Sequence, residues 1–199
     1  DARRLDARAE LKPIPAVETA APSDRPMMPA RDRSKPSPRT TAVRLRFASG
    51  YLGLGMLRAA GRELRGIRKE DRLLPDVLAL QADLCLEERD WDGLLRAGLK
   101  LARQNPADSR GWIHWAYALR EMNHIDGARD VLLTAKREHP DLGVLHFNLA
   151  CYYCLLGDMT AAKRSLDRAC RLKAEWKESA LHDPDLKAFW DHYDPEQIG

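Results

Sequence analysis

The sequence contains no apolar run that approaches the ~18 residues of a membrane-spanning helix, and no charged-then-apolar segment opens it. It also lacks the motifs of nucleotide-binding loops, zinc proteases and hydrolase nucleophiles. We therefore expect a cytoplasmic protein with no membrane association and no enzymatic activity. Because the sequence begins with Asp1 rather than Met, a targeting segment removed upstream stays an open alternative.

Cysteine is scarce, and the four residues lie in helical patterns rather than in a loop-rich framework, which favours reduced thiols. Cys151 and Cys154 form a C-x-x-C pair, but a structural zinc site needs four ligands and only two are at hand. A reactive thiol needs a neighbouring cation, whereas this pair lies among Leu, Tyr and Ala. We expect groove or core fillers, with no metal and no cofactor; a metal or thiol protein is the alternative.

Large apolar side chains are also few in residues 1–40, while residues 1–47 carry 11 Lys or Arg against 6 Asp or Glu and seven of the 12 prolines. Such a composition cannot bury enough surface to offset the entropy of ordering, so we expect a disordered basic tail over 1–40. Only one aromatic, Phe47, accompanies the cations, which leaves no means of stacking on bases. We expect no specific nucleic acid partner, with binding through the tail as an alternative.

What the rest of the chain does contain is a 34-residue period. Alanine recurs at that spacing, and small or aliphatic residues recur 12 and 19 positions after each alanine. Small residues at a fixed phase let two helices cross closely. The recurring positions are Ala48, Ala82, Ala116 and Ala150; Ala60, Leu94, Ala128 and Ala162; and Ile67, Leu101, Ala135 and Ala169.

Each unit holds two apolar stripes of helical spacing separated by a short polar or glycine-containing break, around Gly55, Asp90, Asn123 and Gly157. This pattern predicts a helix, a tight turn and a second antiparallel helix. One pair cannot bury both stripes, so the pairs must stack. We predict an all-α, right-handed α-solenoid over 41–174, with repeats near 41–74, 75–108, 109–142 and 143–174.

These residues resemble the tetratricopeptide repeat (TPR) family, in particular small bacterial TPR proteins. The family pattern has a large residue, Leu, Gly or Ala and Tyr on the first helix, and Ala, a large apolar residue, Ala and Pro on the second. The third unit fits it best, through Trp112, Trp115, Ala116, Ala128, Leu132, Ala135 and Pro140.

Capping helices are expected over 175–199. Asp183 can accept hydrogen bonds from the first amides of a helix that opens with Pro184. Leu186, Phe189 and Trp190 then form an apolar side that suits packing on the last repeat.

The resemblance implies that the first helix of each pair lines a concave groove. The groove should grade from acidic to apolar, and would then suit a peptide or helix with a basic end and an apolar end. Burial of the apolar end by the chain's own C-terminal helices is the open alternative. We expect a protein-protein interaction adaptor, or alternatively a dedicated chaperone for a secreted or membrane-active client, with homo-oligomers possible. The groove residues so implied are Asp76, Asp83, Glu87, Arg110, Ile113, Tyr117, Arg120, Glu121, Phe147, Cys151, Cys154 and Leu155.

Overall fold

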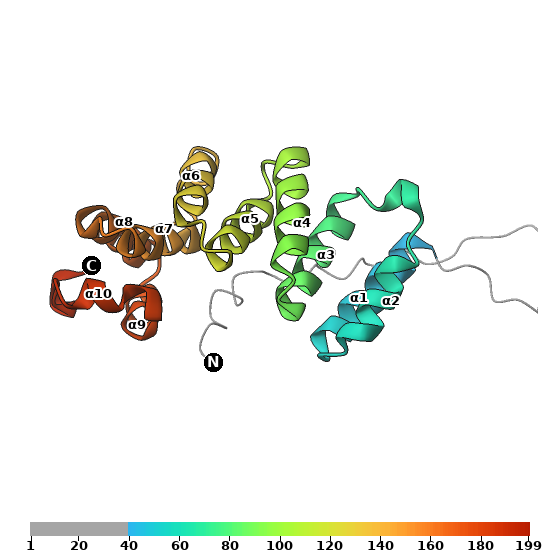
Figure 1. Ribbon diagram of the computed structural model, residues 1–199, viewed down its shortest axis with the longest axis horizontal. Helices are drawn as coiled ribbons and strands as arrows, with labels where there is room; N and C mark the ends of the chain where they lie inside the picture. The colour runs from blue at the N-terminus through green and yellow to red at the C-terminus, as the bar shows by residue number, and fades with distance from the viewer. Residues whose placement is uncertain (1–39) are drawn as a thin grey trace, which may run out of the picture.

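The computed structural model describes residues 40–199, which form helices and turns and no β-strand (Figure 1). The predicted tail lies outside these residues except for Thr40. The helices are α1 (Thr41–Gly53), α2 (Leu57–Arg65), α3 (Pro75–Glu88), α4 (Trp91–Gln104), α5 (Ser109–Glu121), α6 (Ile125–Ala135), α7 (Gly143–Leu155), α8 (Met159–Leu172), α9 (Glu175–His182) and α10 (Lys187–Trp190), with 3-10 turns η2 (Lys69–Asp71), η3 (Pro184–Leu186) and η4 (Pro195–Gln197).

The predicted fold class is confirmed: the chain is an all-α solenoid of helix pairs. Pairs α1–α2, α3–α4, α5–α6 and α7–α8 follow one another along the long axis of the molecule, and α9 and α10 close the C-terminal end (Figure 1). Each helix packs against the next one along the chain, so the fold is built from neighbouring contacts, as expected of a solenoid.

The alanines that define the period lie where the helices cross. All 12 recurring positions are buried, with at most 2 % of any side chain exposed. A larger side chain at the alanine positions would hold the crossing backbones apart. The sequence period therefore marks the contact surface of the stack.

The turns inside the four helix pairs share one backbone conformation. Gly55, Arg89, Asn123 and Gly157 lie 34 residues apart, and all four have a positive φ, between 56° and 81°. In each turn this residue donates its amide to the carbonyl three residues earlier, and the next residue donates to the carbonyl five residues before it. This closure of a helix C-terminus normally favours glycine, which only two of the four turns have.

Glycine occupies both sides of the α4–α5 crossing, where the two backbones lie in close contact. A Cβ at Gly98 would lie 2.7 Å from the backbone nitrogen of Trp115, and a Cβ at Gly111 would lie 2.5 Å from that of Ala102. The backbones therefore approach to a distance that even alanine would prevent. This contact fixes α5 relative to α4, and so fixes the surface that α5 shares with α3.

Candidate functional site

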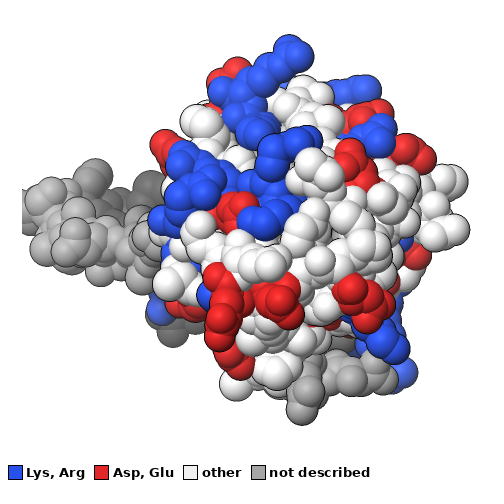
Figure 2. Space-filling model, turned by 90° about the vertical axis from the view of Figure 1, so that its left-hand side faces the viewer, with Lys and Arg blue, Asp and Glu red and all other residues white. Residues whose placement is uncertain are grey.

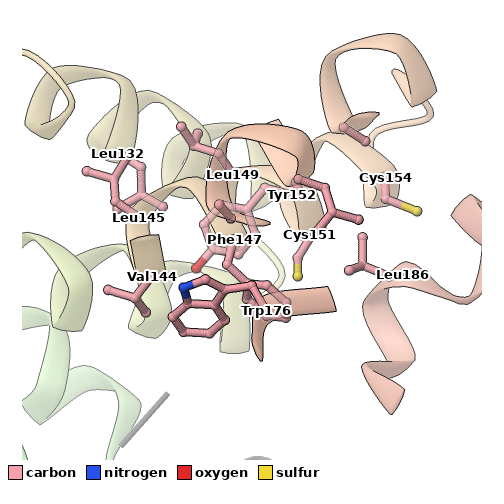
Figure 3. Packing of buried hydrophobic residues seen from close by; sticks show 14 of the residues in the cluster. Leu132, Val144, Leu145, Phe147, Leu149, Cys151, Tyr152, Cys154, Trp176 and Leu186 are labelled. Atoms are coloured by element: carbon pink, nitrogen blue, oxygen red, sulfur yellow. The ribbon is translucent and has the colours of Figure 1, made fainter. Parts of the chain in front are cut away.

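The apolar end of the predicted groove is covered by the chain itself. Phe147, Cys151 and Cys154 are buried beneath α9, η3 and α10. The ring of Phe147 lies 4.8 Å, centroid to centroid, from that of Trp176, and Leu186 lies on the same side of α7 (Figure 3). The expectation that these three residues line an open surface is therefore wrong, because the C-terminal helices cover them.

Two other predicted groove residues also lie apart from a continuous open surface. Ile113 is buried in the cluster that joins α5 to α7. Leu155 is 44 % exposed, but it lies at the C-terminal end of α7, beyond the residues that α9 covers. These two residues therefore do not form a continuous apolar groove between α5 and α7.

The remaining predicted residues come together on α3 and α5. Asp76, Asp83 and Glu87 share one side of α3, and Arg110, Tyr117 and Glu121 have the same spacing on α5. The two helices are in contact, and the Nε2 atom of His114 on α5 lies 3.5 Å from Oδ1 of Asp83 on α3. We call these six residues the α3–α5 face: Asp76, Asp83, Glu87, Arg110, Tyr117 and Glu121.

Arg110 is neutralised where it lies. Its Nε and Nη2 atoms donate to both carboxylate oxygens of Asp108, the N-cap of α5, at 2.7 to 3.2 Å. Burial alone would raise the pKa of Asp108, but hydrogen bonds and charge from Arg110 outweigh it and hold that pKa below its ordinary value. The guanidinium is thus committed to a partner in its own helix.

Arg120 is likewise committed, and it joins the C-terminal cap to the solenoid. Its Nε donates to Oδ2 of Asp185 in η3 and its Nη1 donates to Glu121, both at 2.8 Å, and its Nη2 donates to Oδ1 of Asp185. Asp183 accepts from the amide of Asp185 and so orders the turn that carries this partner. Burial lowers the pKa of Arg120, but the two carboxylates more than reverse the effect and raise it. Arg120 is therefore an anchor for the cap.

An aromatic pair lies beside the acidic residues. The rings of Trp91, at the start of α4, and Tyr117 pack edge to face at a centroid distance of 6.0 Å, and both are half-buried. They rest on a cluster that includes Cys85 and Ala118. The face therefore combines carboxylates with a fixed aromatic edge.

His114 lies beneath this face, fully buried. Neither ring nitrogen has a hydrogen-bond partner. Burial and the charge of Arg110 lower its pKa from 6.5 to about 4. The carboxylate of Asp108 acts in the opposite direction but does not outweigh these two effects. The imidazole is therefore neutral at physiological pH.

The four thiols are free and buried. Burial, with the carboxylates of Asp90 and Glu88 nearby, raises the pKa of Cys85 to about 11, and burial also raises the pKa of Cys151 and Cys154. Such thiols are protonated and weakly nucleophilic at neutral pH. Across residues 40–199, no three His, Cys, Asp or Glu side chains are grouped as metal ligands.

Exposed basic residues gather elsewhere. Figure 2 shows the C-terminal end of the molecule, with Lys and Arg mainly on the upper part, where α6 and α8 lie, and Asp and Glu below them, where α9 and α10 lie. Lys136, Arg137, Arg164 and Arg171 are exposed there. These cations lie on or next to second helices of their pairs, whereas the α3–α5 face belongs to first helices.

Comparison with solved structures agrees with this architecture. The crystal structure of MamA protein superposes with a TM-score of 0.66 at 12 % identity, covering 76 % of this chain and 81 % of that one. TTC0263, a thermophilic TPR protein of Thermus thermophilus, has a TM-score of 0.59 at 24 % sequence identity, covering 76 % of this chain and 87 % of that one. MamA MSR-1 C2 has a TM-score of 0.60 at 20 % sequence identity, covering 69 % of this chain and 79 % of that one. The chain has a TPR fold. No protein-family model and no curated protein matches it.

Within this TPR fold, sequence reasoning missed two contributors to the site. Asp185 binds Arg120, which lies 65 residues earlier in the chain. Trp91 lies 26 residues before Tyr117, and this spacing gives no hint that the two rings are in contact. The described chain also contains no helix of the length and apolar character needed to cross a membrane.

Proposed function

We propose that the protein is a non-enzymatic protein-interaction module that binds a basic peptide or helix of a partner protein on its α3–α5 face. The main observation in support of this proposal is that Arg110, the arginine of the α3–α5 face, is already paired with a carboxylate. Arg110 is held by Asp108, and Arg120 at the edge of the face is held by Asp185 and Glu121. The face also carries the carboxylates of Asp76, Asp83 and Glu87 on α3, and a cluster of carboxylates attracts a cationic ligand.

The aromatic edge supports the same ligand class. A Lys or Arg side chain placed over Tyr117 or Trp91 gains a cation–π contact while its charge faces the α3 carboxylates. Tyrosine, tryptophan and arginine supply most of the binding energy in protein interfaces. Tyr117 is therefore the residue on which we expect binding to depend most.

Burial of Phe147 changes what the ligand must look like. The sequence suggested a partner with an apolar end as well as a basic one. Since Phe147 packs on Trp176, the apolar end of the ligand has no open counterpart on α7. The partner we propose is therefore basic along the segment that binds.

Charge reversal tests the proposal. Asp76→Lys with Glu87→Lys inverts the α3 side of the face, whereas Glu138→Lys adds the same kind of charge at an exposed site after α6 and serves as the control. Affinity purification with mass spectrometry should recover a partner with wild type and the control but not with the double variant. Recovery should also fall as salt is raised. Capture of the same proteins by all three forms would overturn the proposal.

A further inference from the structure

The second helices of the four repeats end in, or are closely followed by, a basic residue at one repeated position. Each of these residues comes two positions after a buried residue of the 34-residue period. Arg103 and Arg171 lie within α4 and α8, where two residues turn the helix by about 200° and direct the later side chain away from the core. All four basic side chains are exposed. We call them the basic row: Lys69, Arg103, Arg137 and Arg171.

The described chain supplies no carboxylate that pairs with the basic row. Among residues 40–199, its four side chains form no ion pair and no side-chain hydrogen bond. Less exposed arginines are paired, for example Arg44 with Glu63 and Arg110 with Asp108. Residues 1–39 carry nine Lys or Arg against six Asp or Glu, so their net charge has the same sign as the row. An anionic partner from another molecule therefore fits the row better than the chain's own N-terminal residues do.

The residues around the row have the same sign of charge. The four members, each taken with the four residues before it, together hold nine Lys or Arg and one Asp. That residue, Asp167, accepts from Lys163. Of the five carboxylates in the loops that follow, those of Asp71, Asp108 and Asp141 are paired with arginines. Positive charge therefore extends along the ends of the second helices.

Helix dipoles explain part of this pattern but not its register. A cation anywhere in the last turn of a helix stabilises that helix. The position seven residues earlier, two turns back on the same side, holds Arg62, Arg96 and Arg164, but Asp130 interrupts it in the third repeat. Asp130 is paired with Arg129. The row at the helix ends, by contrast, is unbroken over the four repeats.

The class of polyanion follows from the shape and chemistry of the row. Single-stranded nucleic acid gains affinity by stacking its bases on aromatic rings, and neither the row nor the four residues before each member include an aromatic residue. The second helices also change direction along the stack: α4 runs upright in Figure 1, whereas α8 lies across the view. A flat bilayer or a stiff DNA duplex therefore meets only part of the row, whereas a flexible chain can follow all of it.

We propose that the basic row binds an extended acidic segment of a partner protein, which runs across the ends of the second helices. An arginine fork holds a carboxylate through two hydrogen bonds, and three of the four members are arginines. An extended chain advances about 3.3 Å per residue, so acidic residues a few positions apart can reach successive repeats. The row belongs to the second helices and the α3–α5 face to the first, so this proposal stands independently of the proposed function.

Fluorescence anisotropy of the full chain with a labelled synthetic peptide of Asp, Glu, Ser and Gly tests this proposal. A peptide of about 40 residues spans about 130 Å when extended. The row variant should bind it about tenfold more weakly than wild type, while the control with the same loss of charge should bind as wild type does. Circular dichroism should show unchanged helicity in both. The two variants are Arg103→Gln, Arg137→Gln and Arg171→Gln in the row, and Arg25→Gln, Arg31→Gln and Arg33→Gln among residues 1–39.

The same three proteins then distinguish the classes of anion. Binding to a DNA duplex, and to vesicles of phosphatidylcholine and phosphatidylserine, should change no more in the row variant than in the control, since both variants lose the same charge. Three results would overturn the proposal: no binding of the acidic peptide by wild type, equal weakening of peptide binding in the two variants, or a loss specific to the row variant that is larger for DNA or vesicles than for the peptide.

Discussion

Besides His146, whose pKa burial also lowers, one fully buried residue should make the protein less stable in acid, and that residue is His114. Its pKa is about 4 in the folded chain and 6.5 when unfolded, so below pH 6.5 the unfolded state binds a proton that the folded state does not. Stability from this group is complete above pH 6.5 and is lost as the pH falls toward 4. The whole difference corresponds to about 3 kcal/mol, and between about pH 7 and pH 5 the loss is about 2 kcal/mol.

Urea unfolding at the two pH values, for wild type and His114→Met, measures this effect. Methionine is close in size and removes two nitrogens that have no hydrogen-bond partner, so at pH 7 the variant should be within about 1 kcal/mol of wild type. At about pH 5 it should have lost about 2 kcal/mol less than wild type. Asp108, whose pKa is lowered, loses its contribution only below its ordinary value near 3.8, outside this window. Equal losses for the two proteins would refute the reasoning.

Four further substitutions give stability predictions that urea unfolding can check. Gly111→Ala should cost about 1–3 kcal/mol because its Cβ meets the α4 backbone, whereas Gly127→Ala, whose Cβ makes only ordinary contact, should gain up to about 1 kcal/mol. Arg89→Gly should stabilise the left-handed turn by about 1 kcal/mol. Phe147→Ala should cost about 3–5 kcal/mol because the ring is buried against Trp176; a loss of partner binding with unchanged stability would contradict this placement.

The fold could be predicted from the sequence because the same 34-residue period marks the helix crossings, the turns and the contacts between repeats. The residues at Ala48, Ala82, Ala116 and Ala150 repeat with the phase of a helix crossing, and the breaks recur at the same spacing. Contacts in a solenoid are local, so a pattern within one repeat largely determines the contact with the next. The glycines at the α4–α5 crossing, by contrast, depart from the pattern, and only the geometry explains them.

The covered end of the predicted groove could have been recognised from α7. Ten of its 13 residues are buried, and the sequence GVLHFNLACYYCL has no polar side. A helix that is apolar all round is covered on all sides. The family pattern assigns Phe147 and Cys151 to a binding surface, but the composition of the helix points to burial.

The ion pair between Arg120 and Asp185 had no signal in the sequence. The two residues are 65 positions apart and belong to different structural units, so neither spacing nor repeat phase relates them. The charge of the α3 carboxylates could be read from the sequence, but the neutralisation of the neighbouring arginines could not. The charge of the proposed ligand depends on that neutralisation.

Site-specific photo-crosslinking tests the central claim most directly. A photoreactive aromatic amino acid, which keeps a ring at the position, replaces Tyr117 on the α3–α5 face or, in a second protein, exposed Leu133 on α6. Mass spectrometry of the adducts should identify, from position 117 only, a protein segment rich in Lys and Arg. Adducts that are the same at both positions, or an acidic or apolar segment captured at position 117, would contradict the account.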